Sequence, residues 1–307
     1  DYEMLNPLYN LLVINYESIH KIPDVKWDML IVDEAHSLGA FPKPNKRAKQ
    51  VRDIIKVNRC LVCLMSGTPT PESYSQMYHQ VFGIPTNPFK EHKTFYKFAN
   101  QYVDKRQKKI NSMYINDYTR GYETIIDKMN PFTYRFSQSD AGFKVDTKEH
   151  ILNVEMDEVT YYLCRKLKRN RVVEGDEEVI LADTPVKLMM KLHQLYSGTI
   201  KFESGKGMVI DTSKAQFIYK KFAGKKIAIF YKFKQELKAI KEVYGDDICT
   251  ELSLFKETNK SIALQIVSGR EGISLKEADA LVYYNIDFSA TSYWQSRDRM
   301  TTIDRLE

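Results

Sequence analysis

The sequence has few cysteines and no long apolar run, so it lacks the features of disulfide-rich secreted proteins, membrane-spanning proteins and proteins with structural zinc sites. It contains four cysteines among 307 residues, too few for a disulfide framework, so we expect a reducing, intracellular compartment. No apolar run is long enough to cross a bilayer, and the N-terminus does not resemble a signal peptide. Cys60 and Cys63 form a CxxC, but no second cysteine pair completes a zinc site. We therefore interpret this pair as core packing.

A strong net charge is also absent. Lysine and arginine number 46, and aspartate and glutamate number 40, which gives a formal net charge of +6. This balance permits a polyanionic partner without requiring one. Hydrophobic residues at 43% and charged residues at 28% are typical of a globular protein. Because 307 residues exceed the size at which one hydrophobic core keeps growing, we expect two domains.

Short apolar runs alternate with helical patterns in the first part of the chain. The runs 10–16, 29–33 and 60–65 predict buried strands. Residues 45–57 predict a helix, and a second helix is expected from Thr70 to Gly83. Strands that are apolar throughout indicate a parallel sheet covered on both faces.

The pattern weakens after residue 84 and then resumes. An aromatic and basic stretch predicts a mostly helical insertion over about 84–140. A second α/β series follows, with expected strands at 149–156, 226–231, 261–268 and 280–286, and expected helices at 157–170, 184–198, 233–244 and 292–300. The sequence therefore predicts an α/β fold with two lobes, over residues 1–140 and 141–307.

Asp33 and Glu34 follow directly on the apolar run 29–33. A carboxylate at the carboxyl end of a parallel strand lies where open α/β sheets bind ligands. In P-loop NTPases such an aspartate holds Mg²⁺, usually through water, and the adjacent carboxylate orients or deprotonates the attacking water. The alternative is two acids that end a strand in solvent. Ala35 and His36 complete a four-letter DEAH match that favours the first interpretation.

Three later segments carry further polar chemistry. "SGTPT" (66–70) supplies small hydroxyls after the next apolar run, although it also fits an ordinary strand-to-helix turn. "SGREGISLKEAD" (268–279) has two glycines that allow close approach to phosphates. "WQSRDRM" (294–300) places arginines on a helix, and an arginine near a γ-phosphate is common in phosphoryl transfer. Each segment alone is a weak indication.

Together and in this order, the segments resemble the Swi/Snf-type branch of superfamily-two helicases, which are DEAH-box ATPases and duplex-DNA translocases with two RecA-like lobes. The motifs that carry the resemblance are "LLVINYE" (11–17) for motif Ib, "WDMLIVDEAH" (27–36) for motif II, "LMSGTPT" (64–70) for motif III, "KIAIFY" (226–231) for motif IV, "SGREGISLKEAD" (268–279) for motif V and "YWQSRDR" (293–299) for motif VI. The resemblance implies ATP and Mg²⁺ as cofactors and double-stranded DNA, bound without sequence specificity, as partner.

Roles for individual residues follow from the resemblance. It implies that Asp33 holds Mg²⁺ through water and that Glu34 acts on the attacking water. His36, Ser66 and Thr68 would couple the nucleotide site to the lobe interface. In the second lobe, the matching catalytic and coupling residues are Gly272, Gln295 and Arg299. The family's second motif VI arginine corresponds to Thr302 here, so Arg305 or Arg297 is the candidate to contact the γ-phosphate.

The sequence lacks a GxxxxGK[ST] P-loop, which holds the β- and γ-phosphates in this family. Its Gly-Lys pairs, at 205–206 and 224–225, lie in the second lobe and match the motif at neither end. We expect the chain to be a fragment that starts after motif I, with its first lobe incomplete. The parent protein would then be an ATPase, and the isolated chain would be inactive.

DNA contact is expected at exposed basic clusters, because translocases follow a phosphate backbone. The candidates are Lys105, Arg106, Lys108, Lys109, Lys168 and Arg169, and the alternative for both clusters is a solvated helix face. Another superfamily-two motor, or a non-hydrolysing DNA-binding module that retains the fold, stays an alternative function. The short lobes suggest a bacterial or phage protein, which would be cytoplasmic, whereas a eukaryotic protein of this kind would be nuclear.

Overall fold

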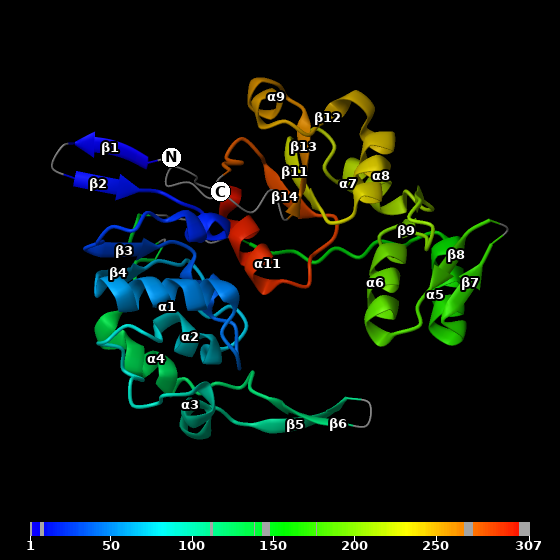
Figure 1. Cartoon of the computed structure of the whole chain (residues 1–307). Coiled ribbons are helices and arrows are strands. Elements are labelled where there is room, and N and C mark those ends of the chain that lie inside the picture. Colours follow the sequence, from blue (N-terminus) through cyan, green and yellow to red (C-terminus); the bar gives the residue numbers. More distant parts are fainter. Residues whose placement is uncertain are drawn as a thin grey trace. The chain divides into compact units, whose positions relative to one another are not determined.

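The computed structural model of the chain describes residues 2–6, 9–110, 113–137, 139–142, 148–175, 177–266 and 273–300 (Figure 1). The chain divides into two units, Asp1–Arg135 and Phe136–Glu307, each considered separately below. Both units contain helices and a parallel sheet, so the predicted α/β class with parallel sheets is confirmed. None of the helices in the described ranges is long and apolar enough to span a membrane.

The first unit begins with a hairpin and a parallel strand pair. Its elements are β1 (Tyr2–Asn6), β2 (Tyr9–Leu12), η1 (Tyr16–Lys21), β3 (Met29–Val32), η2 (Ala35–Leu38), α1 (Lys46–Asn58), β4 (Leu61–Leu64), η3 (Tyr74–Gln76), α2 (Met77–Val81), α3 (Phe95–Tyr102), β5 (Arg106–Ile110), β6 (Met113–Asp117), α4 (Thr124–Met129) and η4 (Asn130–Phe132). β3 and β4 pair in parallel from Met29↔Leu61 to Val32↔Leu64. The predicted helix 45–57 is confirmed as α1, which Asn45 caps by accepting a hydrogen bond from Ala48 N.

The described residues cover only one face of the β3–β4 sheet. Alternate side chains of both strands, among them Val32 and Leu64, pack against α1 and η2. The side chains that point the other way are exposed, with Ile31 at 56% and Leu61 at 73%. The prediction that both faces are covered is therefore wrong here, because strand side chains alternate between faces and helices lie on one of them.

Two related predictions are also wrong. The cysteines of the CxxC, expected in the core, are free thiols and only partly buried. The run 10–16, expected as a buried strand, is β2 over Tyr9–Leu12, and it pairs antiparallel with β1. Leu11 is 48% exposed and Val13 is 75% exposed, because this hairpin packs no helix against that side of the run.

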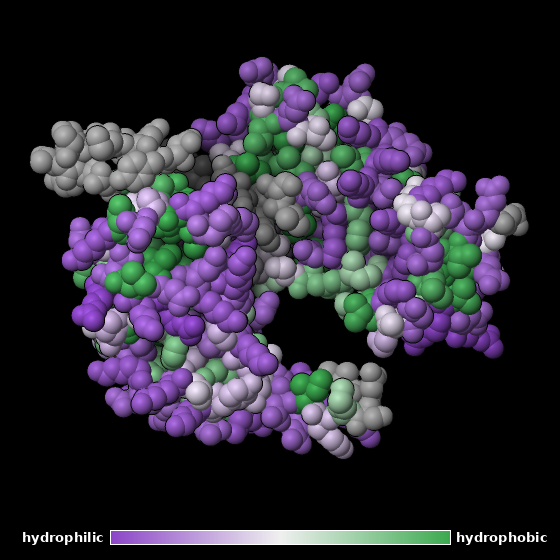
Figure 2. All heavy atoms as spheres, viewed as in Figure 1, coloured by the Kyte–Doolittle hydropathy of each residue, from purple (hydrophilic) through white to green (hydrophobic). Residues whose placement is uncertain are grey.

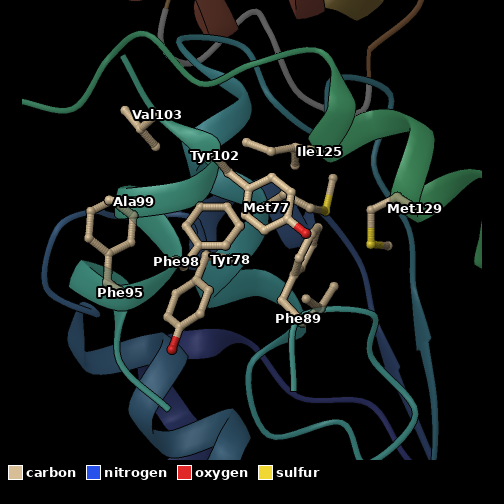
Figure 3. Packing of buried hydrophobic residues seen from close by; sticks show 11 residues of the cluster. Met77, Tyr78, Phe89, Phe95, Phe98, Ala99, Tyr102, Val103, Ile125 and Met129 are labelled. Atoms are coloured by element: carbon tan, nitrogen blue, oxygen red, sulfur yellow. The ribbon is translucent and has the colours of Figure 1, made fainter. Parts of the chain in front are cut away.

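An aromatic cluster forms the main core of the first unit (Figure 3). Phe98 of α3 is fully buried, and its ring centroid lies 4.9 Å from that of Tyr78 and 5.1 Å from that of Phe89. α4 closes the cluster with Ile125 and Met129. Phe95 is also buried, whereas Tyr96 is 49% exposed.

Residues 66–140 differ from the prediction at two places. The helix expected from Thr70 begins later, because Ser73 and Gln76 form a capping box that fixes the start of η3. The insertion expected to be mostly helical contains the antiparallel hairpin β5–β6, whose second strand is rich in aromatic and apolar residues that favour strands. α4 ends at Met129, two residues before Pro131, which cannot continue an α-helix.

The second unit is built on a four-stranded parallel sheet in the order β12–β13–β11–β14. Its elements are α5 (Glu158–Asn170), β7 (Val172–Glu174), β8 (Val179–Leu181), α6 (Pro185–Leu195), β9 (Thr199–Lys201), β10 (Gly207–Val209), α7 (Ser213–Lys221), β11 (Ile227–Tyr231), α8 (Lys234–Tyr244), η5 (Gly245–Asp247), β12 (Ile248–Cys249), α9 (Leu252–Glu257), β13 (Ser261–Gln265), β14 (Ala280–Tyr283), α11 (Ala290–Arg297) and η6 (Asp298–Met300). Every residue of β11 is buried, and the two faces of this strand belong to separate hydrophobic clusters, so this sheet is covered on both faces as predicted.

Most of the helices and central strands predicted for this unit are confirmed. The exception is 149–156, which forms no strand, although Asp157 does stand at the start of α5. The two small hairpins β7–β8 and β9–β10 were not predicted, because strands of three residues are too short to show a periodic pattern.

The aromatic cluster predicts a large effect of truncation at Phe98. Phe98→Ala should lower the free energy of unfolding of the first unit by about 3–5 kcal/mol, since it removes buried surface and leaves a cavity. Urea denaturation followed by Trp27 fluorescence measures this in a Trp294→Phe background, because the chain has two tryptophans. The control Tyr96→Ala should cost about 1 kcal/mol or less. Equal losses would contradict the assignment of Phe98 to the core.

Candidate functional site

The parallel pairing of β3 with β4 brings two polar segments together at the carboxyl edge of the sheet. Met65 N donates to Val32 O at 2.9 Å, and Ala35 N donates to Met65 O at 2.9 Å. These two backbone hydrogen bonds continue the β3–β4 pairing past the last residues of both strands. The acidic pair Asp33-Glu34 therefore lies beside Ser66, at the edge where open α/β sheets bind ligands.

Glu34 has an unusual backbone conformation. Its φ of 49° and ψ of 45° lie in the left-handed region, which few residues with a side chain occupy. Asp33 Oδ1 accepts a hydrogen bond from Glu34 N at 2.9 Å and stabilises this sharp turn. The turn ends β3 abruptly and directs the Glu34 carboxylate toward His36. Backbone strain of this kind is concentrated at functional sites.

His36 links the acidic segment to the segment after β4. Its Nδ1 is hydrogen-bonded to Ser66 Oγ at 3.1 Å. The same atom lies 3.1 Å from Glu34 Oε2, which forms no hydrogen bond with any described residue, so this second contact is an ion pair when the imidazole is protonated. Ser66 Oγ also accepts a hydrogen bond from Thr68 N at 3.1 Å. Thr68 Oγ1 is buried and forms no hydrogen bond with any described residue. Glu34, His36, Ser66 and Thr68, singled out from the sequence, are thus neighbours in the structure.

Tyr16 is a contact of this site that the sequence did not reveal. Its hydroxyl donates to the carbonyl oxygen of Asp33 at 2.7 Å. The Arg47 guanidinium lies 5.1 Å from the centre of the Tyr16 ring and is itself paired with Glu17. Burial raises the pKa of the Tyr16 hydroxyl, which keeps it a hydrogen-bond donor. The tyrosine lies within "NYE", but only the fold shows that it reaches the acidic turn.

The donor set of the site suits a hard divalent cation. Asp33 is exposed and Glu34 is partly exposed, and carboxylate oxygens are the ligands that Mg²⁺ takes, generally with water in the remaining positions. Within the described residues, no group of three or more His, Cys, Asp or Glu side chains could hold a metal ion. A cation at Asp33 would therefore depend on water or a phosphate for most of its ligands.

The motif VI residues lie at the end of the second unit. Gln295 and Arg297 are on α11, and Arg299 is on η6. Arg297 Nη1 pairs with Glu149 Oε1 at 2.8 Å, and its guanidinium lies 4.6 Å from the Trp294 ring centre. Hydrogen bonds from Tyr293 and Arg297 hold the pKa of Glu149 below its usual range. Arg297 is therefore engaged within its own unit.

The backbone of Arg299 is hydrogen-bonded to the segment 268–279, which resembles motif V. Its carbonyl oxygen accepts a hydrogen bond from Leu275 N at 2.9 Å, and Leu275 is fully buried. Gly272, Thr302 and Arg305 lie outside the described residues, so the alternatives for the γ-phosphate arginine stay predictions.

The candidate DNA-binding residues lie on two different elements. In the first unit they follow α3 and continue into β5, and in the second unit they are in the last turn of α5. All of them are exposed: Lys105, Arg106, Lys108 and Lys109 in the first unit, and Lys168 and Arg169 in the second. The alternative of a helix face is wrong for the first group, because Arg106, Lys108 and Lys109 are on a strand.

The fold and the acidic turn define an α/β protein with a polar site at the carboxyl edge of a parallel sheet. A family model of the SNF2-related domain matches residues 2–198. The chain belongs to this family, which confirms the resemblance to the Swi/Snf branch seen in the motifs.

Solved structures and curated proteins were also compared with the chain. A Sulfolobus solfataricus SWI2/SNF2 ATPase core in complex with dsDNA has 16% identity and a TM-score of 0.33, over 88% of this chain and 60% of that one. A Sulfolobus solfataricus SWI2/SNF2 ATPase core domain has 15% identity and a TM-score of 0.37, over 93% of this chain and 63% of that one. The chain thus spans about three fifths of their length. No curated protein matches.

The contact of Tyr16 with Asp33 predicts a measurable effect of removing one hydroxyl. Tyr16→Phe should lower the free energy of unfolding of the first unit by about 1 kcal/mol, the usual net value of a hydrogen bond. Urea denaturation followed by Trp27 fluorescence in the Trp294→Phe background measures it. Tyr122→Phe, at a 46% exposed tyrosine of the same unit, is the matched control and should change nothing. A Tyr16→Phe variant as stable as this control would exclude the contact.

Proposed function

We propose that the protein to which this chain belongs is a DNA-dependent ATPase that couples ATP hydrolysis to movement on duplex DNA. The observation that carries the proposal is the position of His36, whose Nδ1 is 3.1 Å from both Glu34 Oε2 and Ser66 Oγ. One imidazole thereby connects the acidic pair to the segment after the next strand. Membership of the SNF2-related domain family supports the same reaction class.

In this proposal the acidic turn forms the half of the ATP site that binds Mg²⁺ and positions the attacking water. Mg²⁺, when bound, would neutralise charge on the β- and γ-phosphates. Asp33 would hold it through water, because its carboxylate is exposed at the strand end. Glu34 would orient the attacking water and accept its proton. His36 would face the Glu34 carboxylate as a charge partner while its Nδ1 is hydrogen-bonded to Ser66 Oγ.

The other half of the site would come from phosphate-gripping and γ-phosphate-sensing groups. The 307 residues include no GxxxxGK[ST], so we propose that they bind ATP weakly by themselves. Gln295 and one of the arginines Arg297, Arg299 or Arg305 would act from the second unit. Arg297 would first have to leave Glu149, with which it is paired at 2.8 Å.

The exposed basic residues would contact DNA phosphates, which fix position without reading sequence. We propose this role for Lys105, Arg106, Lys108, Lys109, Lys168 and Arg169. A second candidate function is a non-hydrolysing DNA-binding module with the same fold, which the exposed basic residues would serve equally well. The two functions differ in one property, which is ATP turnover.

Substitution of Glu34 tests the catalytic assignment. In the whole protein, Glu34→Gln should lower DNA-stimulated ATP turnover by about 10²–10⁴-fold, since it removes the base while keeping the shape. Steady-state phosphate release with and without duplex DNA measures the effect. The control Glu123→Gln, at an exposed glutamate of the same unit, should keep full turnover. Unchanged turnover in Glu34→Gln would remove Glu34 from its role.

The role of the missing phosphate-binding motif is tested with the 307-residue chain alone. It should show no ATP turnover above background with or without duplex DNA, because nothing in it replaces the P-loop amides and lysine. Single-turnover assays at high enzyme concentration provide the most sensitive measurement. DNA-stimulated turnover by this chain would overturn the proposed division of the ATP site.

A further inference from the structure

The hairpin β5–β6 extends away from the core of the first unit (Figure 1). Its two strands pair from Arg106↔Asp117 to Ile110↔Met113. Tyr118, directly after the hairpin, packs at the margin of the aromatic cluster. The side chains from Arg106 to Lys109 are exposed, and so are those from Met113 to Asn116. Both faces of the ribbon are thus in contact with solvent.

The second strand of this hairpin exposes apolar side chains that have no packing function in the unit. Met113 is 68% exposed, Tyr114 67% and Ile115 47%. Hydrophobic atoms appear together on the outer part of the hairpin in Figure 2, next to hydrophilic ones. A two-stranded ribbon is marginally stable by itself in water. Met113 and Ile115 share one face of the strand and Tyr114 lies on the other, so both faces offer apolar surface to a partner that takes up the whole ribbon.

Each of two apolar side chains has a lysine directly opposite on the same face. Lys108 is paired with Ile115 on one face, and Lys109 with Tyr114 on the other. The Lys109 ammonium lies 5.9 Å from the Tyr114 ring centre. Lys108 forms an ion pair with Asp117, whereas Lys109 has no carboxylate partner among the described residues. Both faces therefore combine a cation with an apolar surface.

The charge of the ribbon favours a polyanion as its partner. Residues 104–117 contain four lysines and arginines but only two aspartates. Asp104 is engaged by Arg106 at 3.0 Å, and Asp117 by Lys108 at 2.5 Å. Duplex DNA offers phosphates at regular spacing beside apolar sugars and the thymine methyl groups of the groove, which matches a cation next to an apolar side chain. The major groove of duplex DNA is wide enough to admit a two-stranded β-ribbon.

We propose that the β5–β6 hairpin enters a groove of duplex DNA, where Tyr114 and Ile115 contact sugars and base edges while Lys109 contacts a phosphate. This inference rests on the proposed function and adds a contact inside the groove to the phosphate contacts described there. The hairpin would hold the unit on the duplex by apolar contact, which salt does not screen, and by charge, which salt does screen.

The apolar contacts and the phosphate contacts of the hairpin can be distinguished experimentally by how DNA binding depends on salt concentration. Fluorescence anisotropy of a short labelled duplex, titrated with the 307-residue chain over a range of salt concentrations, gives the affinity and its salt slope. Tyr114→Ser with Ile115→Ser should weaken binding about 10-fold with an unchanged slope, since the change removes apolar contact surface and no charge. Lys109→Gln should weaken binding and reduce the slope by about 0.9, the value for one lost phosphate contact.

The matched control is Lys56→Gln with Val57→Ser, at the end of α1. It alters an exposed lysine and a 77% exposed apolar side chain in the same unit, and it should bind the duplex as the unaltered chain does. Circular dichroism melting checks that each variant keeps its fold, which is expected because all the altered side chains are exposed.

The outcomes distinguish the hairpin from the proposed function. If the unaltered chain binds the duplex and the Tyr114/Ile115 variant binds equally well, the hairpin inference is overturned, and a protein partner becomes the occupant of the ribbon. In that case the proposed function stands. If the unaltered chain does not bind duplex DNA at any salt concentration, both the hairpin inference and the proposed DNA contacts are overturned.

Discussion

The candidate site depends on the parallel pairing of β3 with β4. This pairing sets the register Val32↔Leu64, and two backbone hydrogen bonds of 2.9 Å continue it past the strand ends, between Met65 and Val32 and between Ala35 and Met65. A shift by one residue would turn every side chain to the opposite face. It would also separate the acidic turn from Ser66. Val32 and Leu64 pack against α1 and η2, which stabilises this register. The contacts that form this core therefore also fix the geometry of the site.

The same unit connects the site to the hairpin through a short series of polar contacts. Gln80 of α2 donates to the carbonyl oxygen of Pro69, in the segment after Ser66, at 2.6 Å. Ser75 of η3 donates to the carbonyl oxygen of Tyr118, at the base of the hairpin, at 2.7 Å. Both residues belong to one continuous element, η3 followed by α2. The segment beside the acidic turn and the base of the proposed DNA-contacting hairpin are therefore both hydrogen-bonded to the η3–α2 element.

Periodicity predicted the long elements, because their patterns depend only on neighbours in sequence. α1 and α6 show a regular apolar face, and β11 is apolar throughout. The DEAH and SGTPT segments predict that Glu34, His36 and Ser66 belong to one site, and the structure places these residues side by side. Contacts that depend on tertiary structure could not be predicted in this way. The Tyr16 hydroxyl contacts Asp33 across 17 residues. The residues of β5 are expected to be helical from the sequence, because their basic side chains carry no periodic apolar signal that would predict a strand.

We propose that His36 couples Glu34 to Ser66, so that the three side chains act together in ATP turnover. A double-mutant cycle with His36→Ala and Ser66→Ala, read as DNA-stimulated ATP turnover by the whole protein, tests it most directly. Residues that act together lose activity in a non-additive way. The account predicts that the double variant is about as slow as the slower single variant. Losses that multiply in the double variant would contradict it, because they would mean that the two side chains act independently.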